Sequence, residues 1–332
     1  MTDQSLAQLS NLAIYSAMAV LTLAMLADAV YLARLVPARE AAKESERERE
    51  LVPAGAVDGE VGDPTSEGSA DAVTGRGAEP LAARKAAGIG WTLTLLGTVL
   101  VVAGVVLRAL EVHRWPLGNM YEFAIFGAMF VLLAYCAWAI RSERDLRWLG
   151  LFVVIPVLLN LGLAITVWYT DASELMPSLR SVWLAIHVTV ATLSVAIFTI
   201  GFSLGVMYLV QDRLESSPER PRSFMSRLPD ARSLERLTYA VHIVAFPLWT
   251  FTVIAGAIWA RQAWGSYWNW DPKEVWSFVI WVVYAAYLHA RATTGWKRQN
   301  AVWIALVGYG CIILNFAVVN VFFVGQHSYS GL

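Results

Sequence analysis

Eight apolar stretches, each close to the length that spans a bilayer, constrain this chain more than any other feature. They lie at 11–33, 89–109, 121–140, 149–169, 182–210, 240–260, 275–290 and 300–324. A helix of about 20 apolar residues crosses the hydrocarbon layer and satisfies its own backbone hydrogen bonds there. The composition agrees, with 57% hydrophobic and 15% charged residues. The sequence therefore predicts an all-α polytopic membrane protein with about eight transmembrane helices.

Lysine and arginine are distributed unequally over the segments between these stretches. Twenty of the 25 lie in 34–88, 141–148, 211–239 and 291–299, and five lie in the alternate loops. The positive-inside rule places the basic set in the cytoplasm. We therefore expect both termini on the outer, extracytoplasmic side of the cell membrane. The first span is expected to be retained, because MTDQSLAQLS lacks the basic start of a signal peptide.

The predicted domains are an N-terminal transmembrane helix (1–34), a cytoplasmic linker (35–88) and a seven-helix membrane domain (89–332). Residues 38–50 are rich in charge and can extend the first helix, whereas 53–80 have almost nothing to bury. We expect a largely disordered linker, and no nucleic-acid partner. Cys136 and Cys311 lie inside apolar spans without a C-x-x-C spacing, so they are interpreted as small buried hydrophobes.

Aromatic residues are concentrated in one outer loop and helix start, WGSYWNWDPKEVW at 264–276. Isolated tryptophans usually anchor a membrane protein at its interfaces. Five aromatic residues within thirteen positions can instead form an apolar surface for a planar macrocycle, and a glycine among them permits a tight turn. The candidate residues are Trp264, Gly265, Tyr267, Trp268, Trp270, Asp271 and Trp276.

Asp271, Pro272 and Glu274 match the start of a helix, with Asp at the N-cap, Pro at N1 and Glu at N3. Capping is the main role expected for Asp271. An additional role for Lys273 or Glu274 stays open.

Histidine is scarce, and an ionisable side chain within a membrane span is a functional hypothesis by default. His187 and His327 fall at the outer side, level with the aromatic loop, and two neutral imidazoles facing one site suit axial ligation of haem iron. Each alone reads more readily as an interfacial or core histidine. The residues themselves assign no nucleophile or acid–base group for catalysis.

His289 follows Trp276 by thirteen positions, which places it roughly 20 Å deeper. A haem bound there would form a second, inner site with another ligand, either His242 or a histidine of a partner protein. His113, in an outer loop, is interpreted as a solvated polar residue.

WGSYWNWDPKEVWSF resembles the tryptophan-rich WWD signature of haem-handling proteins, in the form typical of CcsA/ResC cytochrome c biogenesis proteins, named CcsB in some bacteria. Further stretches fit the same family, and together they cover 89–332. They are WPLGNMYEF at 115–123, SVWLAIHV at 181–188, FPLWTFTVIAGAIWA at 246–260, YLHAR at 287–291 and GQHSY at 325–329.

The resemblance implies a system II cytochrome c assembly component. Haem b would be held at the outer WWD face by His187 and His327 and joined to the CxxCH motif of apocytochrome c. His289 would bind an inner haem together with a histidine of a ResB/Ccs1-type membrane partner, which disfavours His242. The implied activity is that of a holocytochrome c synthetase, or haem lyase, acting with this partner, and a thiol-reducing thioredoxin-like protein is a further candidate partner. The acceptor thiols would be the nucleophiles.

Other classes of protein fit parts of the sequence. The CcmC and CcmF group shares the aromatic platform but lacks the WDPKE, YLH and GQHSY elements. A membrane electron-transfer protein, or a haem transporter without synthetase activity, would also use intramembrane histidines. A small-molecule transporter needs polar groups or broken helices near mid-membrane. The residues that give it slight support are Pro156, Asn160, Pro247, Asn315 and Asn320.

Overall fold

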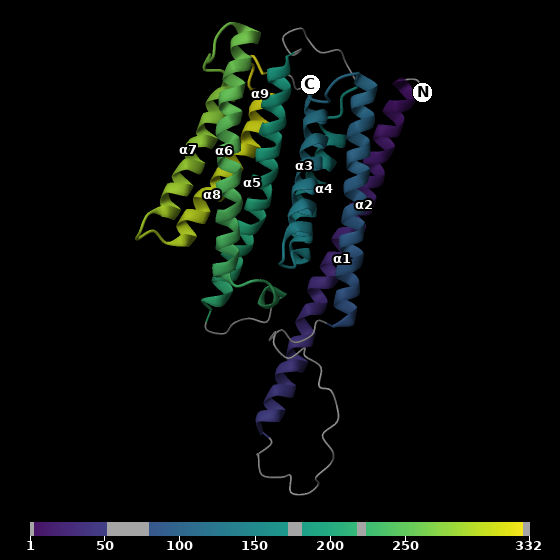
Figure 1. The fold of residues 1–332 in the computed structure, drawn as a ribbon, viewed down its shortest axis with the longest axis vertical. Coiled ribbons are helices and arrows are strands. Elements are labelled where there is room, and N and C mark those ends of the chain that lie inside the picture. The colour runs from purple at the N-terminus through teal and green to yellow at the C-terminus, as the bar shows by residue number, and fades with distance from the viewer. Residues whose placement is uncertain (1–2, 52–79, 172–180, 218–223, 328–332) are drawn as a thin grey trace, which may run out of the picture.

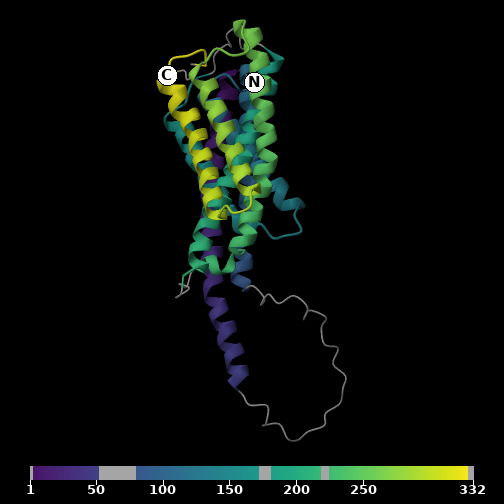
Figure 2. The same ribbon diagram turned by 90° about the vertical axis from the view of Figure 1, so that its left-hand side faces the viewer.

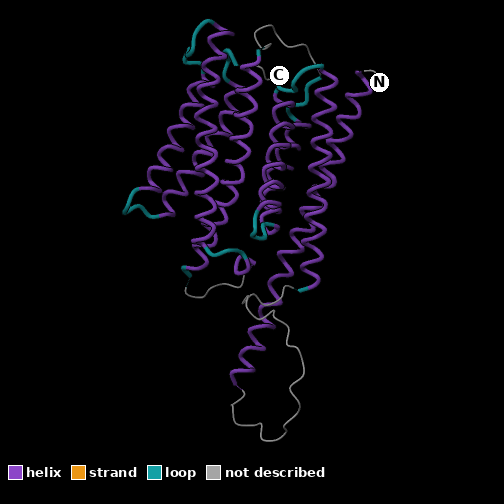
Figure 3. Tube along the Cα trace, in the orientation of Figure 1, coloured by secondary structure: helices purple, strands orange, loops and turns teal. Residues whose placement is uncertain are grey.

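The computed structural model describes residues 3–51, 80–171, 181–217 and 224–327, and all regular elements within these ranges are helical (Figure 3). Eight helical segments there are long and apolar enough to cross a membrane, which confirms the predicted class and number of spans. The elements are α1 (Asp3–Leu51), α2 (Leu81–Val112), α3 (Met120–Arg141), η1 (Arg147–Leu149), α4 (Gly150–Thr166), α5 (Val182–Glu215), η3 (Phe224–Arg227), α6 (Ala231–Trp264), α7 (Pro272–Ala292), α8 (Arg298–Ile313), η4 (Leu314–Val319) and α9 (Asn320–Phe322).

The helices form two neighbouring groups, α1 to α4 and α5 to α9, that run side by side (Figure 1). The two ends of the chain lie at the same end of this bundle, together with the α2–α3 and α6–α7 connections. The α3–α4 and α7–α8 connections lie toward the opposite end, and α1 extends beyond its neighbours there (Figure 2). The two loop sets that differ in basic residues thus lie at opposite ends, and the cytoplasmic assignment of one end stays a prediction.

The first helix is longer than its apolar stretch and packs directly against the rest of the bundle. It runs to Leu51, and α2 begins at Leu81, eight positions before the expected start of the membrane domain. The Leu21 side chain fills the space where a Cβ on Gly97 would be placed, 2.6 Å away. Most of the expected linker, 52–79, lies outside the described residues, so the predicted domain limits are not tested.

Helix α5 is the most buried of the eight spans and joins the two groups. Side-chain hydroxyls tie it to its neighbours, with Ser203 Oγ donating to the Phe152 carbonyl at 2.8 Å and Ser194 Oγ to the Ala245 carbonyl at 2.9 Å. Asn160 makes a similar bond from α4 to the Ala124 carbonyl at 2.7 Å. Such bonds satisfy polar groups inside the bilayer and fix the helix positions.

The last span changes its winding before it ends. After Ile313, α8 continues as the π-helix η4 and then as the short α9. A π-helical turn inside an α-helix changes the direction of the residues that follow, and such turns are frequent at functional sites. Here it precedes Asn320 and the C-terminal segment that carries His327.

The WPLGNMYEF stretch forms the α2–α3 connection around one buried carboxylate. Glu122 has no exposed surface and pairs with Arg108 at 3.2 Å and Arg114 at 2.8 Å. The backbone N–H of Gly118 donates to the same carboxylate at 2.7 Å, and Asn119 caps α3 by accepting from the Glu122 N–H at 2.9 Å. The stretch therefore holds the C-terminal end of α2 and the N-terminal end of α3 together.

Candidate functional site

The start of α7 is a capping box, as the sequence predicts. Asp271 is the N-cap and accepts from the Lys273 N–H at 3.2 Å, and Pro272 is the first helical residue. The Glu274 carboxylate accepts from the Asp271 N–H at 3.2 Å and from the Asn269 N–H at 2.8 Å. These bonds satisfy N–H groups that a helix start otherwise leaves unpaired.

The Asp271 carboxylate also binds the C-terminal segment, which the sequence did not predict. His327 Nδ1 lies 2.7 Å from Asp271 Oδ2, and the Gln326 N–H donates to Oδ1 at 2.6 Å. Burial tends to raise the pKa of the Asp271 carboxyl, but the interaction with His327 and the bonds from the Gln326 and Lys273 amides lower it below its usual range. Asp271 is therefore a buried anion with several donors.

A glycine allows the C-terminal segment to come this close. A Cβ on Gly325 would lie 2.2 Å from Asp271 Oδ1, so any larger side chain would separate the two segments. The glycine in the GQHSY stretch thus permits the contact between His327 and Asp271. Ser328 and Tyr329 of that stretch lie outside the described residues.

The His327 imidazole is oriented by its partners. The ionised Asp271 carboxylate only accepts, so Nδ1 carries a proton and donates it to this carboxylate. The ring contacts two tryptophans edge to face, with centroid distances of 4.8 Å to Trp264 and 5.8 Å to Trp259. Its side chain is 18% exposed, so it lies near the surface of the site.

His187 on α5 is anchored in the same way. Its Nδ1 lies 2.9 Å from the Thr252 carbonyl oxygen of α6, which only accepts, so Nδ1 donates this bond. The ring stacks on Trp259 with a centroid distance of 6.2 Å and an interplanar angle of 14°. A Cβ on Gly256 would lie 2.7 Å from His187 Cε1, so this glycine makes room for the imidazole.

Trp259 borders both imidazoles, so the structure brings His187 and His327 to one aromatic wall. Two histidines anchored through Nδ1 have the arrangement that is usual for metal-binding imidazoles, which ligate iron through Nε2. Trp259 is not among the site residues predicted from the sequence. Thr252, Gly256 and Trp259 follow one helix face at intervals of four and three, and this spacing could have identified it.

The aromatic segment does not form a single flat surface. Trp264 packs at the histidines, whereas Trp268 contacts Trp270 at 5.9 Å and 88° and Phe278 at 6.5 Å and 82°. Tyr267 and Trp270 are 60% and 76% exposed. The rings therefore meet edge to face and continue outward from the histidine site as an exposed aromatic rim.

Gly265 and Trp276, two further members of the aromatic segment, have other structural roles. Gly265 ends α6 in the left-handed conformation at φ 82°, which explains the glycine there. Trp276 lies one turn into α7, partly buried against the core formed by α5 to α8. Neither contacts His187 or His327 among the interactions of the described residues.

Lys273 enters the interior near the histidine site. Its Nζ donates to Asn320 Oδ1 at 2.7 Å, and the Asn320 amide contacts the Met120 sulfur. This contact joins the start of α7 to the residue that follows the π-helix. From the sequence, an additional role for Lys273 stays open. In the structure, its ammonium group lies beside the histidine site.

The inner histidines do not form one site. His242 is buried, its Nδ1 donates to the Thr238 carbonyl at 2.6 Å, and its ring packs on Tyr287 of α7 at 4.8 Å. His289 follows Tyr287 by two residues, about 200° around the helix, and it is exposed. A second ligand for His289 would therefore come from elsewhere than His242. His113 is exposed, as expected.

Comparison with known proteins gives a family that agrees with this geometry. The profile of the family "Cytochrome C assembly protein" matches residues 117–327. The chain is similar to "Cytochrome c biogenesis protein CcsA" of Parasynechococcus marenigrum, with 33% identity over 272 residues, 73% of this chain and 86% of the relative. It is also similar to the protein of that name in Guillardia theta, with 32% identity over 262 residues, 74% of this chain and 86% of the relative.

Proposed function

We propose a haem-presenting role for this chain, which belongs to the CcsA-type family of cytochrome c assembly proteins and acts in cytochrome c biogenesis. In this proposal, the outer end of the bundle holds haem b as a substrate and presents it for covalent attachment to apocytochrome c. The observation that carries the proposal is the matched pair of imidazoles. His187 and His327 each have an anchored Nδ1, and both border Trp259.

The residues of the chain would supply position and orientation rather than a nucleophile. Asp271 holds His327 and the Thr252 carbonyl holds His187 through Nδ1, so that each ring would bind iron through Nε2. Trp259 and Trp264 would form the apolar wall, and the partly buried Trp268 and the exposed Trp270 would extend it toward the acceptor protein. Holding two reactants in a fixed geometry accelerates a reaction by proximity.

The attachment itself forms two thioether bonds. Each cysteine sulfur of the CxxCH acceptor bonds to one carbon of a haem vinyl group, and the thiol hydrogen adds to the other carbon. No residue of this chain has to act as a nucleophile, and its two cysteines, Cys136 and Cys311, are buried. The synthetase, or haem lyase, activity would therefore rest on the positioning of haem and of an acceptor whose thiols a thioredoxin-like protein keeps reduced.

A second haem position would be completed by a partner. His289 is exposed on α7 and faces away from His242, which supports ligation shared with a histidine of another chain. A ResB/Ccs1-type membrane protein is the proposed partner. The distribution of basic residues supports a location in the cell membrane with the His187 and His327 end on the extracytoplasmic face.

The proposal is tested by histidine variants co-expressed with the ResB-type partner. His187→Ala and His327→Ala are expected to lose outer-site haem and holocytochrome c, and added imidazole is expected to restore both by filling the vacated axial position. His289→Ala should lose the inner haem. His113→Ala is the control because His113 is exposed in a loop. Full haem retention in all three site variants would overturn the proposal, and haem binding without thioether formation would reduce it to haem transport.

A further inference from the structure

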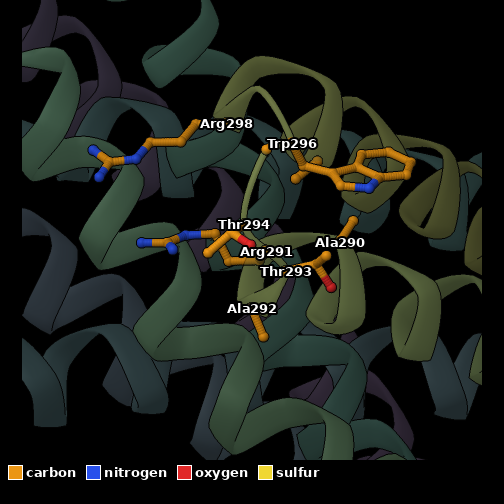
Figure 4. Close-up of a pocket in the computed structure, with 9 residues that line it drawn as sticks. Ala290, Arg291, Ala292, Thr293, Thr294, Trp296 and Arg298 are labelled. Atoms are coloured by element: carbon orange, nitrogen blue, oxygen red, sulfur yellow. The ribbon is translucent and has the colours of Figure 1, made fainter.

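We propose that a pocket at the α7–α8 turn binds the phosphate of an anionic phospholipid headgroup. The pocket has a volume of about 270 Å³ and lies where α7 ends and α8 begins, at the opposite end of α7 from Asp271 (Figure 4). Its lining includes Arg291, Thr294, Trp296 and Arg298. This pocket is separate from His187 and His327, and its lining begins at Ala290, the residue after His289; binding of a phosphate there does not depend on the proposed function.

One of the two arginines is held by the protein. Arg291 donates through Nε and Nη2 to the carboxylate of Glu235, which has no exposed surface, and its guanidinium lies 4.8 Å from the Tyr239 ring centroid. These contacts leave Arg291 partly neutralised and fixed in position. It therefore forms a rigid, polar wall of the pocket.

The second arginine has room to bind a ligand. Arg298 is half exposed, and its Nε is 3.9 Å from Glu235, beyond hydrogen-bond distance. Two arginines, Arg291 and Arg298, thus share the Glu235 carboxylate, and Lys297 is exposed beside Arg298 in the sequence. An oxyanion in the pocket would be paired by a guanidinium whose planar donors suit phosphate geometry.

The start of α8 adds to this preference. Lys297 occupies the N-cap and offers no side-chain acceptor to the helix. The first N–H groups of a helix favour a negative charge. This helix start would add to the stabilisation of a phosphate that Arg298 binds in the pocket. It does not form the site by itself.

The exposed Trp296 favours a ligand that has an apolar part. Gly295 has φ 93°, and this left-handed residue allows the sharp turn that leaves Trp296 52% exposed at the pocket. Tryptophan favours the membrane interface, where one side of its ring contacts acyl chains and the other faces headgroups. A cationic pocket bordered by such a ring fits a lipid better than a freely dissolved anion.

The size of the pocket limits how much of a ligand it can enclose. Sites for drug-sized ligands usually measure about 300–1,000 Å³. The volume here, about 270 Å³, is below that range. It accommodates a glycerophosphate headgroup whose acyl chains remain in the bilayer, and it is too small to enclose a macrocycle.

The test measures lipids retained by the full-length protein in detergent, using native mass spectrometry. Delipidated protein is titrated with phosphatidylglycerol or with phosphatidylcholine, and inorganic phosphate is added as a competitor. We expect a preference for phosphatidylglycerol that falls about fivefold in Arg298→Gln and less in Arg298→Lys, because one cation near an anionic headgroup contributes roughly this factor.

Arg144→Gln is the matched control, because Arg144 is an exposed arginine in the α3–α4 connection toward the same end of the bundle. Lys297→Gln provides a second variant if Arg298→Gln is poorly expressed. Equal retention of both lipids, or equal losses in Arg298→Gln and Arg144→Gln, would overturn the proposal. Displacement of the lipid by millimolar phosphate alone would keep the oxyanion chemistry but overturn the lipid as its source.

Discussion

His327 Nδ1 and Asp271 Oδ2 lie 2.7 Å apart, although 56 residues separate them in the chain. The carboxylate that caps α7 therefore also orients the imidazole proposed as a haem ligand. This contact connects the aromatic segment to the C-terminal segment, so a change at the cap reaches the site without altering any proposed ligand.

Replacement of Asp271 should change haem binding through His327. Asp271→Asn keeps a good N-cap but removes the charge, and Asp271→Ala removes both. Since partners of metal-binding histidines usually contribute about 10–100-fold in affinity, we expect the alanine variant to lose outer haem affinity by this order. The asparagine variant should retain haem with a more positive midpoint potential, because a neutral partner makes the imidazole less basic.

The matched control is Asp230→Asn, which makes the same change at the N-cap of α6. Haem titration and spectroelectrochemistry provide the readouts. An unchanged potential in Asp271→Asn, or an equal shift in Asp230→Asn, would contradict a role for the carboxylate in orienting His327.

A methyl group added at Gly256 should displace His187. The new Cβ would lie 2.7 Å from Cε1 and 2.8 Å from Nδ1 of the imidazole. Alanine normally stabilises a helix by about 0.5–1 kcal/mol relative to glycine. Gly256→Ala is therefore expected to lose outer haem while the protein still folds.

Gly310→Ala is the control for helix propensity, since a Cβ there meets nothing within 4 Å. Haem absorbance and thermal unfolding are measured for both variants. If Gly256→Ala binds haem as Gly310→Ala does, the imidazole does not depend on the space that glycine leaves.

The sequence predicts the spans and the helix starts because both depend on local pattern. Hydropathy locates all eight spans, and the D-P-x-E order locates the capping box at Asp271. It does not predict the Asp271–His327 bond, because that contact depends on how the end of α8 turns after the π-helix. Nor does the sequence distinguish Trp259 from an ordinary core tryptophan, because the role of Trp259 depends on a histidine from another helix.

The expected platform of five aromatic residues is a second feature whose geometry the sequence pattern does not predict. Composition predicts that the rings cluster, but the angles between them follow from backbone geometry. Trp270, for example, has φ 60°, a left-handed conformation that no pattern in the sequence indicates. The extension of α1 beyond its apolar stretch is within reach of the sequence, because the charged residues 38–50 are expected to be able to continue the helix, which runs to Leu51.

Loss of the Glu122 charge should destabilise the junction between α2 and α3. Glu122→Gln removes the carboxylate that Arg108 and Arg114 share, and leaves Arg108, which is 2% exposed, paired with Glu111 at 3.3 Å. Breaking a buried ion pair on one side usually costs about 3–5 kcal/mol. We expect a marked decrease in the unfolding temperature in detergent, compared with little change for Glu143→Gln at an exposed position. Equal unfolding temperatures of the two variants would show that the cluster around Glu122 does not stabilise the structure.

Helix α1 packs closely against α2 at Asp28. The strength of this contact can be measured as the coupling free energy between two substitutions. A Cβ on Gly90 would lie 2.0 Å from Asp28 Oδ1. Gly90→Ala should therefore cost about 1–3 kcal/mol as an overpacked contact, although alanine favours the helix. The cost should largely disappear in the Asp28→Ala background, with a coupling of about 0.5–3 kcal/mol in a double-mutant cycle of unfolding free energies. Gly88→Ala is the control two residues away, because its Cβ meets nothing within 4 Å. Additive effects of Asp28→Ala and Gly90→Ala would contradict direct packing of α1 against α2 at this position.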